Sequence, residues 1–154
     1  MKWFIQDRIL HGAYEKREEV PTEVDFLATQ YEGAIPKRTG WNIPMVFIEQ
    51  YATKRSFLRT YIKIADYMIV YPKNDIQTKK HELLHALYGI CPDYREQVSR
   101  LWESLTDKEQ DRVRTVLRNL YYPDNPAIQL DEFQAYYYTE KSSFFGIGVR
   151  PLRK

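Results

Sequence analysis

The chain has 154 residues, of which 44% are hydrophobic and 29% are charged, and its formal net charge is +2. This length suits one domain with its own hydrophobic core, so we expect residues 1–154 to form a single domain. Acidic and basic residues are interspersed along most of the chain, which argues against a nucleic-acid-binding protein. No apolar segment is long enough to predict a membrane span.

The cysteine content and the N-terminal residues indicate the compartment. A single cysteine excludes an intrachain disulfide framework. The N-terminal apolar run is interrupted early by Asp7 and Arg8, unlike a signal peptide. We therefore expect a cytoplasmic protein, with secretion by a non-classical route left open.

Residues 141–154 contain bases and no acids, which favours a solvated tail.

Strand-forming residues are concentrated in the first half of the chain. Short strands are predicted at residues 3–5 and 45–48, and residues 23–31 are expected to form a helix or a loop. The stretch 59–71 is rich in β-branched and aromatic residues, which predicts one long strand or a hairpin that turns near Asp66.

Helix signals dominate the second half. A helix is expected to end near Gly89, and a second one covers residues 94–105. Side chains that can cap helix N-termini mark the starts of three helices: Asn74 or Asp75, the capping box of Thr106 and Glu109, and Asn125-Pro126. The predicted fold class is therefore α+β, with an N-terminal mixed or antiparallel sheet, a central helix and a mainly helical C-terminal part.

The central helix carries the segment His81-Glu82-Leu83-Leu84-His85. Residues four apart project from the same face of a helix, so His81 and His85 can bind one metal ion together. Glu82 would then lie beside the coordination position that a water molecule occupies. This HExxH pattern is typical of zinc-dependent hydrolases, in which one helical turn supplies two ligands and a general base.

A catalytic zinc ion has three protein ligands, so one more is needed. His11 lies far upstream in a region predicted to be irregular, and we expect it on the surface. Cys91 stands six residues after His85, the position of the third ligand in the pattern HExxHxxGxxH. However, Tyr88 occupies the glycine position, and we expect Cys91 to be a small buried residue. The acidic candidates all lie further downstream: Glu132, which we prefer, and Asp124, Asp131 and Glu140.

Through residues 81–85 and 131–136 the chain resembles the gluzincin group of zinc metallopeptidases, in particular its small lethal-factor-type members. In that group a glutamate on a later helix, followed by an aromatic and a small residue, completes the metal site. The resemblance implies a zincin-like fold and one Zn²⁺ per chain, held by His81, His85 and Glu132.

Two positions depart from the pattern of the group. Lys79 stands two residues before the first histidine, where an uncharged residue is usual. Tyr136 stands where many gluzincins carry an acid that orients a ligand histidine, so the partners of the two histidines stay unassigned.

The resemblance also implies the reaction, which is hydrolysis of a peptide bond in a peptide or protein substrate. Glu82 would act as the general base. A tyrosine would stabilise the oxyanion, and Tyr121, Tyr122 and Tyr136 are the candidates. The strand at residues 67–71 is expected to be an edge strand along which an extended substrate can pair.

Three alternatives to a peptidase stay open. The main one is a non-catalytic protein-interaction module on a zincin-like fold, which would not need Glu82 as a base. A deformylase-like amidase has the same motif but takes a cysteine ligand from upstream of it, whereas Cys91 lies downstream. A nucleic-acid adaptor is the least favoured, and the sequence does not indicate an oligomeric state.

Overall fold

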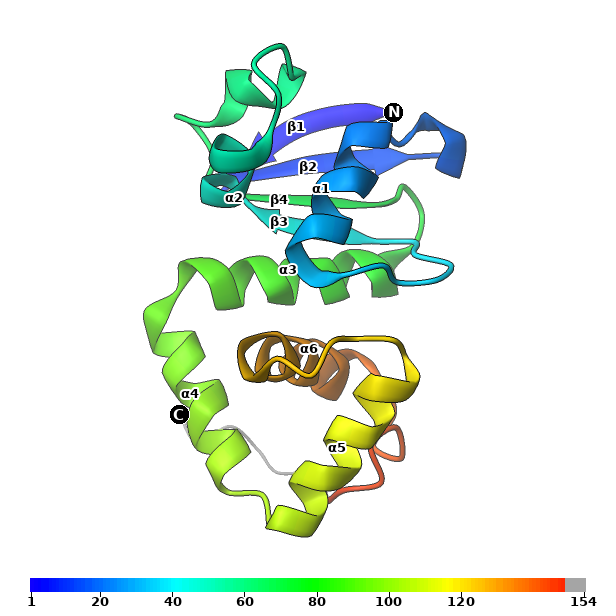
Figure 1. The fold of residues 1–154 in the computed structure, drawn as a ribbon, viewed down its shortest axis with the longest axis vertical. Helices are drawn as coiled ribbons and strands as arrows, with labels where there is room; N and C mark the ends of the chain where they lie inside the picture. The colour runs from blue at the N-terminus through cyan, green and yellow to red at the C-terminus, as the bar shows by residue number, and fades with distance from the viewer. Residues whose placement is uncertain (149–154) are drawn as a thin grey trace.

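The computed structural model describes residues 1–148, and the basic end of the predicted tail, with Arg150, Arg153 and Lys154, lies outside this range. Within it the chain forms an α+β fold with one four-stranded mixed sheet and six α-helices (Figure 1). The strands are β1 (Lys2–Gln6), β2 (Ile9–Tyr14), β3 (Trp41–Pro44) and β4 (Tyr67–Pro72). The helices are α1 (Thr22–Glu32), α2 (Met45–Tyr51), α3 (Ile76–Ile90), α4 (Pro92–Glu103), α5 (Asp107–Asn119) and α6 (Pro126–Thr139). Two short 3-10 helices cover Arg17–Glu19 and Phe57–Tyr61.

The sheet has the strand order β1-β2-β4-β3. The outer pairs β1–β2 and β3–β4 are antiparallel, whereas β2 and β4 are parallel. Asp7 and Arg8 form the turn between β1 and β2 and have φ angles of 54° and 60°, which suit the right-handed twist of a tight hairpin. The predicted mixed sheet is confirmed in this arrangement.

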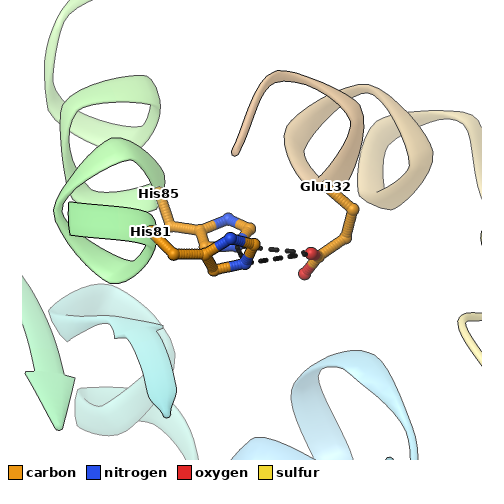
Figure 2. Close-up of side chains that lie close together, drawn as sticks. All are labelled: His81, His85 and Glu132. Atoms are coloured by element: carbon orange, nitrogen blue, oxygen red, sulfur yellow. Dashed lines mark hydrogen bonds and ion pairs between the residues drawn. The ribbon is translucent and has the colours of Figure 1, made fainter. Parts of the chain in front are cut away.

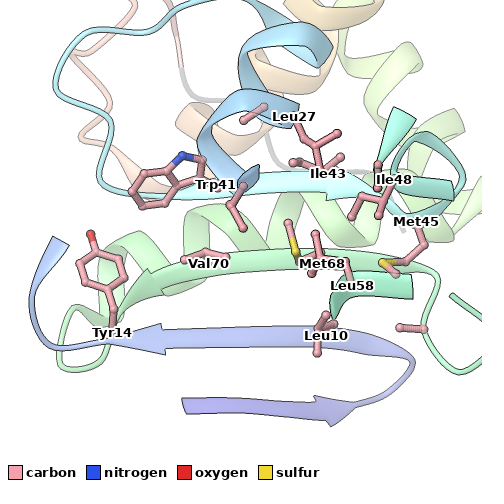
Figure 3. Packing of buried hydrophobic residues seen from close by; sticks show 14 residues of the cluster. Leu10, Tyr14, Leu27, Trp41, Ile43, Met45, Ile48, Leu58, Met68 and Val70 are labelled. Carbon is pink, nitrogen blue, oxygen red and sulfur yellow. The ribbon is translucent and has the colours of Figure 1, made fainter. Parts of the chain in front are cut away.

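Alternation along the strands divides the buried residues between the two faces of the sheet. Leu10, Ile43 and Met68 belong to the main hydrophobic core, together with residues of α1 and α2 (Figure 3). Ile69, on the opposite face, packs with Ala86 of α3. Asn42 lies between two core residues of β3 and therefore projects from the face that α3 covers. The sheet thus positions α3 and presents the polar side chain of Asn42 to it.

The second half of the chain is helical, as predicted. Asp75 caps α3, Thr106 and Glu109 form the capping box of α5, and Asn125 caps α6. A second core forms around Phe133 of α6, with apolar residues of α4, α5 and the segment after α6. Figure 1 shows α3 between the sheet and α6, so the two halves of the molecule meet along this helix. Within residues 1–148, no helix has both the length and the apolar character needed to cross a bilayer.

Two strand predictions were wrong. Residues 45–48 belong to α2, because the buried side chains Met45 and Ile48 have helical rather than alternating spacing. The strand is instead β3, which ends at Pro44. Of the stretch 59–71, only the end is a strand; its start is a 3-10 helix that Ser56 caps by accepting a hydrogen bond from the amide of Leu58.

The predicted places of β4 and His11 are also corrected. β4 lies between β2 and β3, so residues 67–71 are not an edge strand, and β3 is the edge nearest to the motif. His11 is not in an irregular surface region. It lies on β2 with only 2% of its surface exposed, and its Nδ1 is 2.9 Å from the hydroxyl of Tyr71. The sequence did not predict β2, because its residues ILHGAY show little alternation of polar and apolar side chains.

Candidate metal centre

The motif occupies the middle of α3. Leu83 and Ala86 pack toward the sheet, so the face that carries His81 and His85 is directed away from it. The helix ends near Gly89 as predicted, with Ile90 as its last residue. A Cβ atom at Gly89 would overlap the ring of Tyr67, so a glycine is required there for close packing of α3 on β4.

The two histidines of α3 meet Glu132 of α6 (Figure 2). The Nε2 atoms of His81 and His85 are 3.2 Å apart. Oε2 of Glu132 lies 3.3 Å from Nε2 of His85 and 3.7 Å from Nε2 of His81. The three potential ligand atoms thus form a nearly equilateral triangle.

This triangle has the dimensions of a metal site. Two ligand atoms of a tetrahedral zinc ion, each about 2.1 Å from the metal, lie about 3.4 Å apart. Oε2 of Glu132 is buried and accepts no hydrogen bond, although buried carboxylate oxygens are normally paired. A cation bound between His81, His85 and Glu132 would satisfy this oxygen, so the residues present fit a metal ion.

Helix α6 also supplies a partner for each histidine. Nδ1 of His85 is 2.8 Å from Oδ1 of Asp131, and Nδ1 of His81 is 3.4 Å from Oγ1 of Thr139. A carboxylate only accepts hydrogen bonds, so Nδ1 of His85 donates to Asp131, and Nε2, the ring nitrogen nearest Glu132, is the atom left for a metal ion. Asp131, which the sequence offered as a rival ligand, thus has the place of an orienting acceptor.

The electrostatic field at the centre favours positive charge. Burial opposes charging of His85, but attraction by Asp131 and Glu132 outweighs it and raises the pKa of His85 well above its ordinary value. Burial would also raise the pKa of Glu132, yet the histidines, chiefly His85, lower it below its ordinary value. A carboxylate that stays ionised beside imidazole nitrogens is suited to metal binding.

Glu82 is held beside the triangle by the edge strand. Only 5% of its surface is exposed, and Nδ2 of Asn42 donates to Oε2 of Glu82 at 3.0 Å. The hydroxyl of Tyr67 donates in turn to Oδ1 of Asn42, which fixes the orientation of the amide. Burial raises the pKa of Glu82, which strengthens it as a proton acceptor. The alternation Trp41-Asn42-Ile43 could have identified Asn42 from the sequence, but β3 was predicted at the wrong residues.

The centre opens into a cleft of about 650 Å³. The three candidate tyrosines all line this cleft, but they differ in environment. Tyr121 is 68% exposed and has a φ of 71°, whereas Tyr122 and Tyr136 are partly buried and their hydroxyls are 2.9 Å apart. The ring centroid of Tyr136 lies 4.5 Å from that of His81. Burial raises the pKa of Tyr122 and of Tyr136, so both phenols keep their protons and can donate hydrogen bonds.

The other candidate ligands do not reach the triangle. His11 contacts Tyr71, and Cys91 lies at the junction of α3 and α4, where it is partly buried rather than fully buried as expected. Asp124 pairs with Arg118. Glu140 lines the cleft, but its carboxylate contacts Gln77. Among residues 1–148, His81, His85 and Glu132 are the group whose ligand atoms could share one metal ion.

Comparisons with models of known protein families, with curated proteins and with solved structures give no match to this chain. A function can therefore be argued only from the residues of the site and their geometry.

Proposed function

We propose that the chain is a zinc-dependent hydrolase, and specifically a small metallopeptidase of the gluzincin type. The observation that carries this proposal is the triangle of Nε2 of His81, Nε2 of His85 and Oε2 of Glu132, with the buried carboxylate of Glu82 beside it. A purely structural metal site needs no base next to an open position, whereas hydrolysis does. Zinc is proposed because imidazole and carboxylate ligands in a tetrahedral arrangement suit it.

Each residue of the site has a role in this reaction. His81, His85 and Glu132 would hold Zn²⁺, which when bound acidifies a water molecule and polarises the scissile carbonyl. Glu82 accepts the proton of the attacking water and passes it to the leaving amine. Asn42 keeps the Glu82 carboxylate in place through its amide hydrogen bond.

The negative charge on the tetrahedral intermediate requires a hydrogen-bond donor. Tyr136 lies beside His81, and its hydroxyl pairs with that of Tyr122, so these two tyrosines are better placed than the exposed Tyr121. In this pair one hydroxyl can accept a hydrogen bond from the other tyrosine and donate its own proton to the oxyanion. Replacement of each by phenylalanine should lower kcat, with the larger loss at the donor.

Metal content of the purified protein tests the proposal first. We expect about one zinc per wild-type chain, and a large loss in Glu132→Ala. Glu140→Ala is the matched control, because Glu140 lines the same cleft without belonging to the triangle. Zinc that is equally retained by Glu132→Ala, or absent from the wild type after reconstitution, would refute the site.

Turnover of Glu82→Gln tests the reaction. The amide keeps the size of the side chain but cannot accept the proton of water, so zinc should remain bound while peptide hydrolysis falls by at least about 100-fold. The measurement is cleavage of a mixed peptide library followed by mass spectrometry. A wild type that binds zinc but cleaves no peptide would favour an interaction module over an enzyme.

A further inference from the structure

We infer that Gln134 and Tyr94 are positioning residues for the metal ligand His85, so that the site depends on a buried chain of side chains reaching α4. The inference rests on the proposed metal site. It starts from an unusual burial: Gln134 lies on α6 with 0% of its surface exposed, next to the core residue Phe133. A buried amide needs partners for both of its ends.

The hydrogen bonds of Gln134 fix its orientation. The hydroxyl of Tyr94 donates to Oε1 of Gln134 at 2.7 Å, so Nε2 must face the other way. Nε2 donates to Oδ1 of Asp131 at 3.1 Å and to the backbone oxygen of Leu84 at 3.1 Å. Both partners are acceptors, so all three contacts agree on one orientation of the amide.

Both acceptors of this amide adjoin His85. Oδ1 of Asp131 is the same atom that accepts from Nδ1 of His85, and Leu84 is the residue before His85 in α3. Gln134 therefore ties α6 to the backbone of α3 beside the ligand, and it holds the carboxylate that sets the rotation of the imidazole. Partners of metal-bound histidines commonly affect metal affinity in this way.

Tyr94 and Gln134 thus lie outside the triangle and reach it only through Asp131, Leu84 and His85. Gln134 and Tyr94 are not among the residues that line the cleft, so neither can touch a substrate there. Their effect on the site would pass through the geometry of His85 relative to Glu132.

Zinc affinity of the full chain tests this inference, with the zinc dissociation constant measured by competition with a chromophoric chelator. Gln134→Leu should weaken zinc binding by about 10- to 100-fold. Tyr94→Phe removes the donor to Oε1 but leaves both hydrogen bonds of Nε2, so it should weaken binding by a smaller factor. Gln129→Leu is the matched control, because Gln129 is a buried glutamine of the same helix that donates instead to Asp124.

Two further measurements separate positioning from a general loss of stability. The melting temperature of each metal-free variant reports the fold, and the absorption spectrum of the cobalt-substituted protein reports the geometry of the ligands. A positioning role predicts a changed cobalt spectrum in Gln134→Leu and an unchanged one in Gln129→Leu. Tyr94→Phe, the milder change, carries the test if Gln134→Leu does not fold.

The outcomes differ from those that decide the proposed function. Weaker zinc binding in Gln134→Leu supports the inference even if the wild type cleaves no peptide, which would refute the peptidase alone. Equal zinc affinity and equal cobalt spectra in Gln134→Leu and Gln129→Leu would overturn the inference and leave the peptidase standing. A wild type that binds no zinc would overturn both.

Discussion

Gly40 is the residue on which the position of the candidate base depends most directly. A Cβ atom there would overlap the carboxylate of Glu82 and approach Cγ2 of Thr78 to 2.9 Å. Glu82 is the group that can move, and a displaced carboxylate would lose its place beside the triangle of potential ligand atoms. We expect Gly40→Ala to retain zinc but to lower kcat about 10- to 100-fold, as measured by peptide hydrolysis and metal content.

Gly148→Ala is the control for this prediction, since a Cβ atom at Gly148 meets no atom within 4 Å. Activity of Gly40→Ala equal to that of Gly148→Ala would show that Glu82 does not need its present position. The two substitutions have the same effect on the unfolded chain, so their difference reports the folded site.

At the residue scale, the sequence was sufficient to predict the relative positions of side chains where spacing along one element determines their geometry. His81, Glu82 and His85 share one helical turn, and their relative placement follows from the pitch of the helix. The position of Glu132 depends on how α6 packs on α3, which no local pattern encodes, so the sequence could only rank it above Asp131. The orienting contact of Asp131 with His85 was missed for the same reason.

At the scale of elements, the helix caps are the local signals whose effect can be measured. Thr106 accepts from the amide of Glu109, and the Glu109 side chain accepts from the amide of Thr106. We expect Thr106→Ala to lower the free energy of unfolding by about 1 kcal/mol in urea titrations. Thr115→Ala, on the exposed side of the same helix, should change it by less than about 0.5 kcal/mol. Similar losses in both variants would contradict a specific capping role.

The helices α3 to α6 were predictable because their capping residues and 3.6-residue periodicity are local signals, contained in each segment of the sequence. The sheet was harder to predict, because its pairing is non-local. β2 pairs with β4 across more than fifty residues, and the helix α2 was mistaken for a strand because its apolar run is short.

At the scale of the whole molecule, the candidate site joins two helices that are distant in the sequence, with His81 and His85 on α3 and Glu132 on α6. Metal binding should therefore stabilise the fold by mass action. At free zinc a hundred times its dissociation constant, the gain is about 2.7 kcal/mol, which corresponds to a rise in Tm of about 5–10 °C for a chain of this size. Calorimetry with and without a chelator measures it, and Glu132→Ala should show little of this rise.

His11 predicts how stability depends on pH. Burial, aided by the charge of Lys79, lowers the pKa of His11 to about 4, whereas in the unfolded chain it is about 6.5. Between these values the unfolded chain binds a proton that the folded chain does not. Stability is thus complete above about pH 6.5 and falls toward pH 4, by about 1–3 kcal/mol from this residue.

Urea titrations of the wild type and of His11→Gln, at several values between pH 7 and pH 4.5, isolate this contribution. The carboxylates and the other histidines titrate in both proteins, so the difference between the two curves belongs to His11. Curves that stay parallel over this range would contradict the role assigned to its burial.

Helix α6 carries Glu132, Asp131 and Thr139, so the third atom of the triangle and the partners of both histidines come from 14 consecutive residues. This has a consequence for biosynthesis. A growing chain that has left the ribosome only as far as α5 exposes His81, Glu82 and His85 with neither the third ligand nor the partners that orient the histidines. The candidate metal centre is completed only when the last helix of the described chain docks, and until then the nascent protein carries two of its three potential ligands.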